Sequence, residues 1–336
     1  MKVKFVLFGL SLGIVAASQI ACSNQGVNNA FQGVKQENSQ TAVSTEGIEQ
    51  EDILSPSLEE DTGQNATSEN GNKDDNEAIM AEFIELTSDE NVKIADVIDF
   101  IQKNVDTVSK ENASTMLLNL EELQIAYRTV LEEKYFSQEI QAGFIEMLLD
   151  GIDYTNPENI EDEGQKSLVQ ETRSHGFTID QAEGTVFPII DYTIYEDFRT
   201  YATEDIADYF HIMAIESAKP FAKDAALMIE WDKVIDRLLQ AESFITKFDS
   251  SSKAEEIASL YRRYERIALL GLDNTPLFDY DGNTMKEEAK EAYEKAIATS
   301  EGSAFLEKLK NYMDVIAEND YKLTKEVIEF RDNLIK

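Results

Sequence analysis

The chain has 336 residues and carries 66 acidic against 30 basic side chains, which gives a formal net charge of −36 at pH 7. A field of this sign repels phosphate groups, so it excludes nucleic acid as a partner and disfavours anionic lipid head groups, while it attracts cationic partners and divalent ions. A well-solvated surface outside the cell would carry the same charge without any such partner.

The chain opens with a short basic segment, residues 1–4, and 13 apolar residues from Phe5 to Ala17. A run of 13 is too short to cross a bilayer, which takes about 20 residues, and it fits the core of a secretory signal peptide. Ala21 follows as a small residue directly before Cys22, the single cysteine of the chain. An intramolecular disulfide is therefore excluded, and the fold must rest on its apolar core.

Residues 1–22 resemble bacterial lipoprotein signal peptides. The resemblance implies that residues 1–21 are removed, that the thiol of Cys22 is diacylated, and that the protein is anchored at the extracytoplasmic face of the cell membrane. Two acyl chains hold a protein stably where one is marginal. An ordinary secreted protein cleaved near Ala21 is the alternative, and it leaves Cys22 without a role. Once Lys2 and Lys4 are gone, 28 basic residues face 66 acidic ones, a net charge of −38.

Residues 22–76 are expected to form a disordered acidic tether. From residue 23 onward this segment holds eleven acids against two bases, Lys35 and Lys73, and Phe31 is its only aromatic residue. Such a composition cannot bury enough apolar surface to offset the chain entropy lost on folding. A flexible coil of this length reaches about 40 Å, which suits a spacer between a membrane and a folded domain.

From residue 77 onward the apolar spacing becomes helical, which predicts a mainly α fold of antiparallel helical hairpins or a bundle. We expect an N-terminal helical subdomain at 77–155 and a C-terminal helical domain at 156–336. The clearest stripe alternates steps of four and three residues, as the buried side of an amphipathic helix does. Its members are Leu227, Trp231, Val234, Leu238, Ala241, Ile245 and Phe248. Shorter stripes begin at Met116, Ile257, Phe305 and Leu323.

Three pairs have the spacing of a capping box at a helix start: Thr87 with Glu90, Ser252 with Glu255, and Thr284 with Glu287. The four prolines of the body fall between helical stretches, as their missing N–H requires. They are Pro157, Pro188, Pro220 and Pro276.

One small β-hairpin is expected near residues 177–188. Aromatic and β-branched residues at 177–179 and 185–187 flank Glu183 and Gly184, which read as its turn. Gly176 is expected to stop the preceding helix, Ser167–His175. Pro188 confines the second strand to a sheet edge, and an isolated hairpin must pack on the helices to be stable.

Two further resemblances concern the body. The junction of tetratricopeptide-like helical repeats is similar to Ala241-Glu242-Ser243-Phe244, Phe248-Asp249-Ser250 and Ser252-Lys253-Ala254-Glu255; a generic antiparallel helical hairpin shows the same pattern. Residues 176–280 resemble uncharacterised lipoproteins of Gram-positive bacteria, through Glu183-Gly184, Pro188-Ile189-Ile190-Asp191-Tyr192 and Asn274-Thr275-Pro276-Leu277-Phe278. This second resemblance implies a cell type and no chemistry.

Catalytic residues are not predicted. The two histidines are His175, beside a helix end where a cation suits the helix dipole, and His211, on a helix expected from Asp205 to Glu216 with Asp208 as its local ion-pair partner. Two histidines fall short of the three protein ligands of a catalytic zinc site. The sequence lacks HExxH, GxSxG and a glycine-rich phosphate loop. Carboxylate pairs acting as acid and base stay open, because sequence does not show which acids meet.

The only metal candidates are Asp279, Asp281 and Asn283, whose spacing of two resembles the opening of an EF-hand calcium loop. Thr284 stands where that loop needs glycine, and Lys290 stands where it needs the bidentate glutamate. Asp, Gly and Asn are also ordinary turn residues. We therefore expect a structured connection that binds no calcium, and no cofactor beyond the lipid on Cys22.

These observations favour a non-catalytic binding or scaffolding protein, anchored to the membrane through its N-terminal lipid and holding an envelope protein or peptide. Helix pairs commonly present grooves and faces to such partners. The alternative is an envelope enzyme that uses carboxylates alone or carboxylates with a divalent metal ion.

Overall fold

The computed structural model describes residues 69–299 and 302–335, with side chains from residue 76. The expected leader, Cys22 and residues 22–68 of the expected tether lie outside this part of the chain. The fold is mainly α-helical, as the sequence predicts. Its α-helices are α1 (Glu69–Thr87), α2 (Ile94–Asn104), α3 (Lys110–Tyr135), α4 (Gln138–Leu149), α5 (Glu163–Ser174), α6 (Glu204–Ala218), α7 (Trp231–Lys247), α8 (Ala254–Leu270), α9 (Glu287–Thr299), α10 (Ala304–Glu318) and α11 (Lys325–Leu334). Helix α1 thus begins inside the segment expected to be tether.

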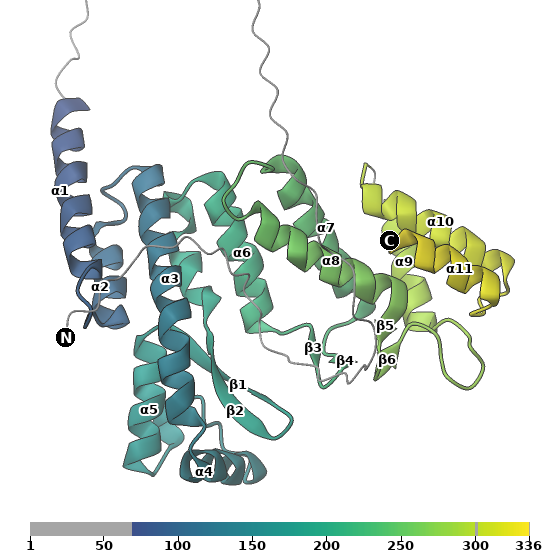
Figure 1. The fold of residues 1–336 in the computed structure, drawn as a ribbon, viewed down its shortest axis with the longest axis horizontal. Coiled ribbons are helices and arrows are strands. Elements are labelled where there is room, and N and C mark those ends of the chain that lie inside the picture. Colours follow the sequence, from purple (N-terminus) through teal and green to yellow (C-terminus); the bar gives the residue numbers. More distant parts are fainter. Residues whose placement is uncertain (1–68, 300–301, 336) are drawn as a thin grey trace, which may run out of the picture.

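Short 3-10 helices and strands fill the connections between these helices. They are η1 (Pro157–Asn159), η2 (Tyr192–Tyr201), β1 (Phe177–Ala182), β2 (Thr185–Ile190), β3 (Ala222–Lys223), β4 (Ala226–Leu227), β5 (Gly271–Leu272) and β6 (Thr275–Pro276). Figure 1 shows the elements following one another roughly in chain order along the long axis, from α1 at one end to α10 and α11 at the other. Within the described residues, every helix is too short or too polar to cross a membrane.

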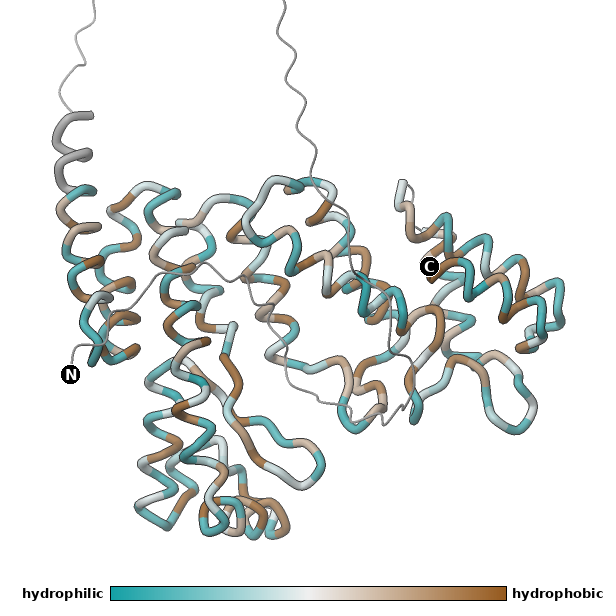
Figure 2. Tube along the Cα trace, in the orientation of Figure 1, coloured by the Kyte–Doolittle hydropathy of each residue, from teal (hydrophilic) through white to brown (hydrophobic). Residues whose placement is uncertain are grey.

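Helix α7 confirms the clearest stripe of the sequence. Trp231, Val234, Leu238 and Ala241 are all buried on its inner side, and hydrophobic positions recur in the same way along the other helices (Figure 2). The helix expected to begin with Leu227 is wrong at its start, since Leu227 lies in β4 and α7 begins at Trp231. Helix α8 follows after a short loop and packs against α7 as a helical hairpin.

The three expected capping boxes are wrong. Thr87 lies at the end of α1, where its hydroxyl donates to the carbonyl of Phe83 at 2.9 Å. Helix α8 begins after Lys253 without a side-chain cap, and Thr284 forms an isolated bridge with Lys322.

The caps of the structure are other side chains, each accepting from an N–H of the first turn. They are Ser109 for α3, Ser137 for α4, Asp162 for α5, Ser303 for α10 and Thr324 for α11.

The expected hairpin forms, and it runs from Phe177 opposite Ile190 to Ala182 opposite Thr185. Glu183 and Gly184 both have positive φ, 49° and 73°, which is the two-residue turn that matches the twist of paired strands. The hairpin packs on α3 and α4.

Helix α4 also completes the hydrogen bonding of the second strand. The side-chain amide of Gln141 accepts from the N–H of Val186 at 2.9 Å and donates to its carbonyl at 2.6 Å. The edge of β2 is therefore capped at that point.

Two shorter hairpins, β3–β4 and β5–β6, were not predicted. The turn between β3 and β4 holds Asp224 and Ala225 at positive φ, 49° and 57°. The two hairpins touch, because the N–H of Asn274 donates to the carbonyl of Ala225 at 2.9 Å and its side chain donates to the carbonyl of Asp224 at 2.6 Å. These contacts connect the loop before α7 to the loop after α8.

Among the residues that the structure describes, the buried apolar side chains form two clusters that meet along α7 and α8. The first runs from Phe83 on α1 through the hairpin to Ala241 and Phe244 on α7 and Ile257 on α8. The second runs from Ile229 to Val327 on α11. The division expected between residues 155 and 156 falls within the first cluster, and it stays a prediction.

Candidate functional site

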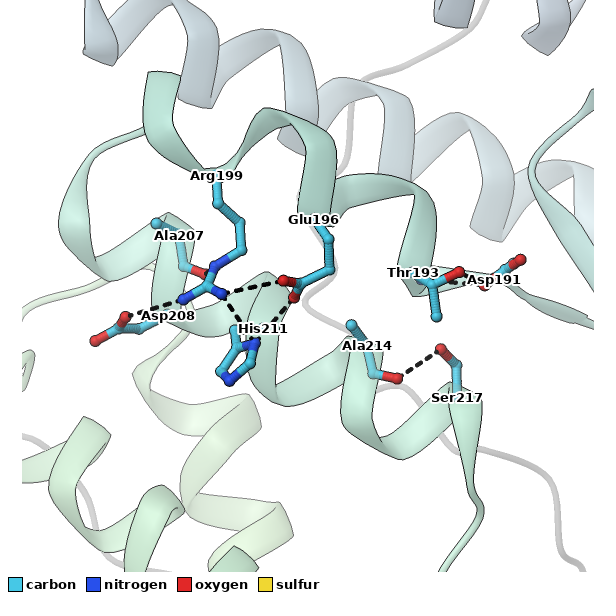
Figure 3. A network of polar contacts seen from close by, with 9 residues as sticks. All are labelled: Asp191, Thr193, Glu196, Arg199, Ala207, Asp208, His211, Ala214 and Ser217. Atoms are coloured by element: carbon cyan, nitrogen blue, oxygen red, sulfur yellow. Dashed lines mark hydrogen bonds and ion pairs between the residues drawn. The ribbon is translucent and has the colours of Figure 1, made fainter.

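Four polar side chains meet where η2 lies beside α6, and we call them the polar cluster: Glu196, Arg199, Asp208 and His211 (Figure 3). Glu196 and Arg199 are three residues apart on η2, which places them one above the other in a helix of three residues per turn. Asp208 and His211 have the same separation on α6. Two helix faces therefore bring two acids, a guanidinium and an imidazole together.

Arg199 holds the polar cluster together. Its Nη1 lies 3.0 Å from Glu196 Oε2 and its Nη2 lies 4.0 Å from Asp208 Oδ1. Its Nε donates to the carbonyl of Ala207 at 3.2 Å, which ties η2 to the backbone of α6. The expected pairing of His211 with Asp208 is wrong, since Nδ1 of His211 lies 2.9 Å from Glu196 Oε1 instead.

The electrostatics favour an ionised Glu196. Burial alone would raise the pKa of its carboxyl, but hydrogen bonds from His211 and Arg199 and the positive charge of Arg199 outweigh burial and lower that pKa. Nδ1 of His211 also lies 3.0 Å from Nη1 of Arg199. When Nδ1 carries the ring proton it donates to Glu196, and when the proton is on the other ring nitrogen Nδ1 accepts from Arg199. The other ring nitrogen points away from the cluster (Figure 3).

A shallow groove of about 200 Å³ lies beside the polar cluster, between α6 and α7. Asp208 belongs to both. Its lining combines apolar and polar side chains: Asp208, Ile212, Gln240, Ser243, Phe244, Lys247 and Phe248. A volume of this size holds one side chain of a partner and is smaller than the roughly 300–1,000 Å³ of ordinary small-molecule sites. In the part of the chain that the structure describes, no group of three or more His, Cys, Asp or Glu side chains is placed to hold a metal ion.

A second polar network is buried between α3, η2, α6 and the start of α8. Glu121 is fully buried and accepts from the hydroxyls of Tyr192, at 2.8 Å, and Tyr209. Its other oxygen lies 2.6 Å from Nζ of Lys253, which also lies 3.3 Å from Glu256. These contacts join residues 132 positions apart in the chain.

The proton count of this network points to a protonated Glu256. Tyr209 lies within hydrogen-bond distance of both Glu121 and Glu256, 2.8 Å for the latter, yet a phenol has one proton to donate. A protonated Glu256 supplies the missing donor. Burial raises the pKa of Glu256, and the charge of Glu121 adds to this, while Lys253 acts in the opposite direction.

The loop that holds the three metal candidates, Asp279, Asp281 and Asn283, is stabilised by hydrogen bonds between its own residues. Oδ1 of Asp279 accepts from the N–H of Gly282 at 2.5 Å, and the N–H of Asp279 donates to the carbonyl of Thr284 at 2.8 Å. Asn283 has a φ of 52°, and its carbonyl accepts from the N–H of Leu323 at 2.7 Å. The structure thus uses Asp279 and Asn283 as turn residues, and Asp281 is exposed. Lys290 pairs with Glu287 at 3.3 Å.

The other residues singled out by the sequence have separate places. His175 caps the C-terminus of α5, as expected, and its ring stacks on Tyr127 with centroids 5.0 Å apart. Cys22, the expected lipidation site, lies outside the described residues.

Large apolar side chains are exposed at the end of α4 and just after it: Leu148, Leu149 and Ile152. Together with the half-buried Ile145 beside them, we call them the α4 apolar surface. Phe144 and Met147 face the core, so Ile145, Leu148 and Leu149 lie on the flank turned away from it. Leu149 is 81% exposed. Hydrophobic residues colour α4 along its length at the lower edge of the molecule (Figure 2).

Sequence reasoning missed Glu121 and the α4 apolar surface, although both leave a signal. The buried positions of α3 include Ala113, Leu117, Leu120, Gln124 and Leu131, and Glu121 falls on the same stripe. An acid on an apolar stripe predicts a buried partner. In α4, apolar residues occupy more of the helix surface than the stripe that faces the core. This pattern indicates a helix whose second side is also buried, by a partner outside the chain.

No family model, curated protein or solved structure matches this chain.

Proposed function

We propose that this chain is a lipid-anchored protein of the extracytoplasmic membrane face that binds an envelope protein or peptide and does not itself catalyse a reaction. The anchor is proposed on the resemblance of residues 1–22 to lipoprotein signal peptides. The observation that carries the binding function is the α4 apolar surface, where aliphatic side chains stay in contact with water. Contiguous apolar exposure of this kind marks interaction sites on soluble domains.

The position of α4 supports this role. Helix α1 begins at the upper edge of the molecule in Figure 1, and α4 lies at the lower edge of the same half. A tether that joins α1 to a membrane would therefore leave α4 free to meet a partner. The contacts of Gln141 with Val186 and the burial of Phe144 hold α4 on the hairpin, so its outer side is presented by a fixed scaffold.

Within the polar cluster, Glu196 is poorly suited to act as a general acid. A general acid or base works best with a pKa near the working pH, and the pKa of Glu196 is lowered by His211 and Arg199. Arg199 also pairs with Asp208, so the acids beside the groove are already engaged.

The test uses cells that produce the full chain with a photo-crosslinking amino acid at Leu149. We expect light to join the chain to one defined envelope protein or peptide. The same crosslinker at Tyr280, which is also exposed, serves as the control and should give no such product. Cys22→Ala should release the protein from the membrane fraction. Equal products at both positions would refute the binding site, and a membrane-bound Cys22→Ala variant would refute the anchor.

A further inference from the structure

The α4 apolar surface lies in a stretch without basic residues. Between Lys134 and Lys166 the chain has no Lys, Arg or His, and it has eight acids: Glu139, Glu146, Asp150, Asp153, Glu158, Glu161, Asp162 and Glu163. Four of them lie on α4 or within four residues of its end. Glu139, Glu146, Asp150 and Asp153 are all exposed. Aliphatic side chains and carboxylates therefore share this end of the molecule.

Among the described residues, the nearest cations make no direct ion pair with Glu139, Glu146 or Asp150, whereas hydrogen bonds from Thr155 and the charge of Arg173 lower the pKa of Asp153. Lys134 pairs with Glu171 at 2.5 Å on the other side of the α3 terminus, and Lys166 lies 3.8 Å from Glu158. Arg173 donates to the carbonyl of Thr155 at 3.2 Å. The surface thus presents an apolar strip with an unbalanced negative border.

The apolar strip and its negative border together indicate which kind of partner binds this surface. A second copy of the chain would bring the same carboxylates against themselves, and like charges brought together at an interface cost several kcal/mol. An anionic bilayer is repelled for the same reason. A partner with apolar side chains bordered by Lys or Arg satisfies both parts of the surface.

We infer that the α4 apolar surface binds a cationic amphipathic segment of its partner, with aliphatic side chains against Leu148, Leu149 and Ile152 and basic side chains against Glu146 and Asp150. The inference rests on the proposed binding function and names the chemistry of the partner. Helix α4 is about 18 Å long at 1.5 Å per residue. A helical segment of about 12 residues therefore covers the strip along its whole length.

The experiment measures binding of the mature chain, residues 22–336 with Cys22→Ser, to a fluorescent synthetic 18-residue amphipathic helix of Leu and Lys. Fluorescence anisotropy at several salt concentrations gives Kd and its salt dependence. Leu149→Ser should weaken binding about 10-fold, because it removes a side chain that the peptide buries. Glu146→Gln with Asp150→Asn should weaken binding at low salt and flatten its salt dependence.

The matched control lies on α1, where the exposed Ile84 stands between the exposed acids Glu82 and Glu85. Ile84→Ser and the pair Glu82→Gln with Glu85→Gln make the same changes to another acidic helix, and they should leave Kd unchanged. Equal losses at α1 and α4 would show that the peptide follows the overall charge, which overturns the inference. A peptide with the same composition in scrambled order should bind more weakly.

Two further results would overturn the inference in other ways. Concentration-dependent dimerisation, abolished by Leu149→Ser in sedimentation, would assign the surface to a second copy. Binding to vesicles of phosphatidylglycerol that depends on Leu149 would assign it to lipid. If the peptide fails to bind while crosslinking at Leu149 in cells persists, the binding function stands and the cationic partner is wrong. Because Leu149 is exposed, its replacement should leave the circular dichroism spectrum unchanged.

Discussion

Replacing Glu121 tests whether the buried network stabilises the junction of α3, η2, α6 and the start of α8. Glu121→Leu removes the acceptor of two tyrosine hydroxyls and the nearest counter-ion of Lys253, whose side chain is 16% exposed. Breaking a buried ion pair by removing one partner costs about 3–5 kcal/mol. Glu256 lies 3.3 Å from Lys253 and ionises more readily once the charge of Glu121, which helps raise its pKa, is gone. We therefore expect a loss near 3 kcal/mol, the lower end of that range.

The assay is urea unfolding of the mature chain followed by circular dichroism, with the fluorescence of Trp231 as a second probe. Trp231 belongs to the second core cluster, whereas Glu121 lies among residues of the first. The dichroism transition should therefore shift at least as much as the fluorescence transition. Glu122→Leu, at the exposed neighbouring position, is the control and should change the unfolding free energy by less than about 0.5 kcal/mol.

A double-mutant cycle of Glu121→Leu with Lys253→Met isolates the interaction energy between Glu121 and Lys253. The free energy of unfolding lost in the double variant should be smaller, by at least about 1 kcal/mol, than the sum of the losses in the two single variants. The reason is that the effects of substituting two groups in contact do not add. A loss below about 1 kcal/mol for Glu121→Leu, or strict additivity with Lys253→Met, would refute the reasoning.

Three further predictions concern Glu256, Trp231 and the loop that holds Asp279. The raised pKa of Glu256 means that its stabilising protonated form is complete below the usual value of about 4.5 and is lost as pH rises through the higher folded value; Glu256→Gln should therefore gain stability relative to the native chain as pH rises, and a constant difference would contradict this. Trp231→Ala should cost about 3–5 kcal/mol in urea unfolding, since this buried ring stands edge-on to Tyr293 at 6.0 Å. Calcium should raise the melting temperature no more than magnesium at equal ionic strength, and a calcium-specific rise lost in Asp279→Asn with Asp281→Asn would show that the loop binds the ion.

Local patterns were predictable where neighbours in sequence decide the structure. The hairpin followed from Glu183 and Gly184, because a turn with two positive φ values strongly favours such residues. The inner side of α7 followed from its spacing. Capping was predicted wrongly because a hydroxyl three residues before an acid is common, and Thr284 found its partners in the loop before α11 instead.

The candidate sites depended on contacts that local patterns do not contain. Glu121 has its lysine 132 positions later, and the partner of His211 proved to be Glu196, 15 positions earlier, in place of the nearby Asp208. Which apolar residues of α4 face the core was decided by the hairpin that packs on it. The excess of apolar residues on α4 is visible in the sequence, but only the structure shows that Leu148 and Leu149 are the exposed ones.

The contact between Glu121 and Lys253 also joins two parts of the chain that are synthesised at different times. Most elements pack on neighbours in sequence, so they form as soon as their own stretch of chain is available, and such local contacts favour rapid folding. Glu121 is different, because its ammonium partner is synthesised 132 residues later. Until α8 is synthesised, Glu121 lies on the apolar stripe of α3 without this cation. The packing around Glu121 is therefore complete only when the start of α8 is in place.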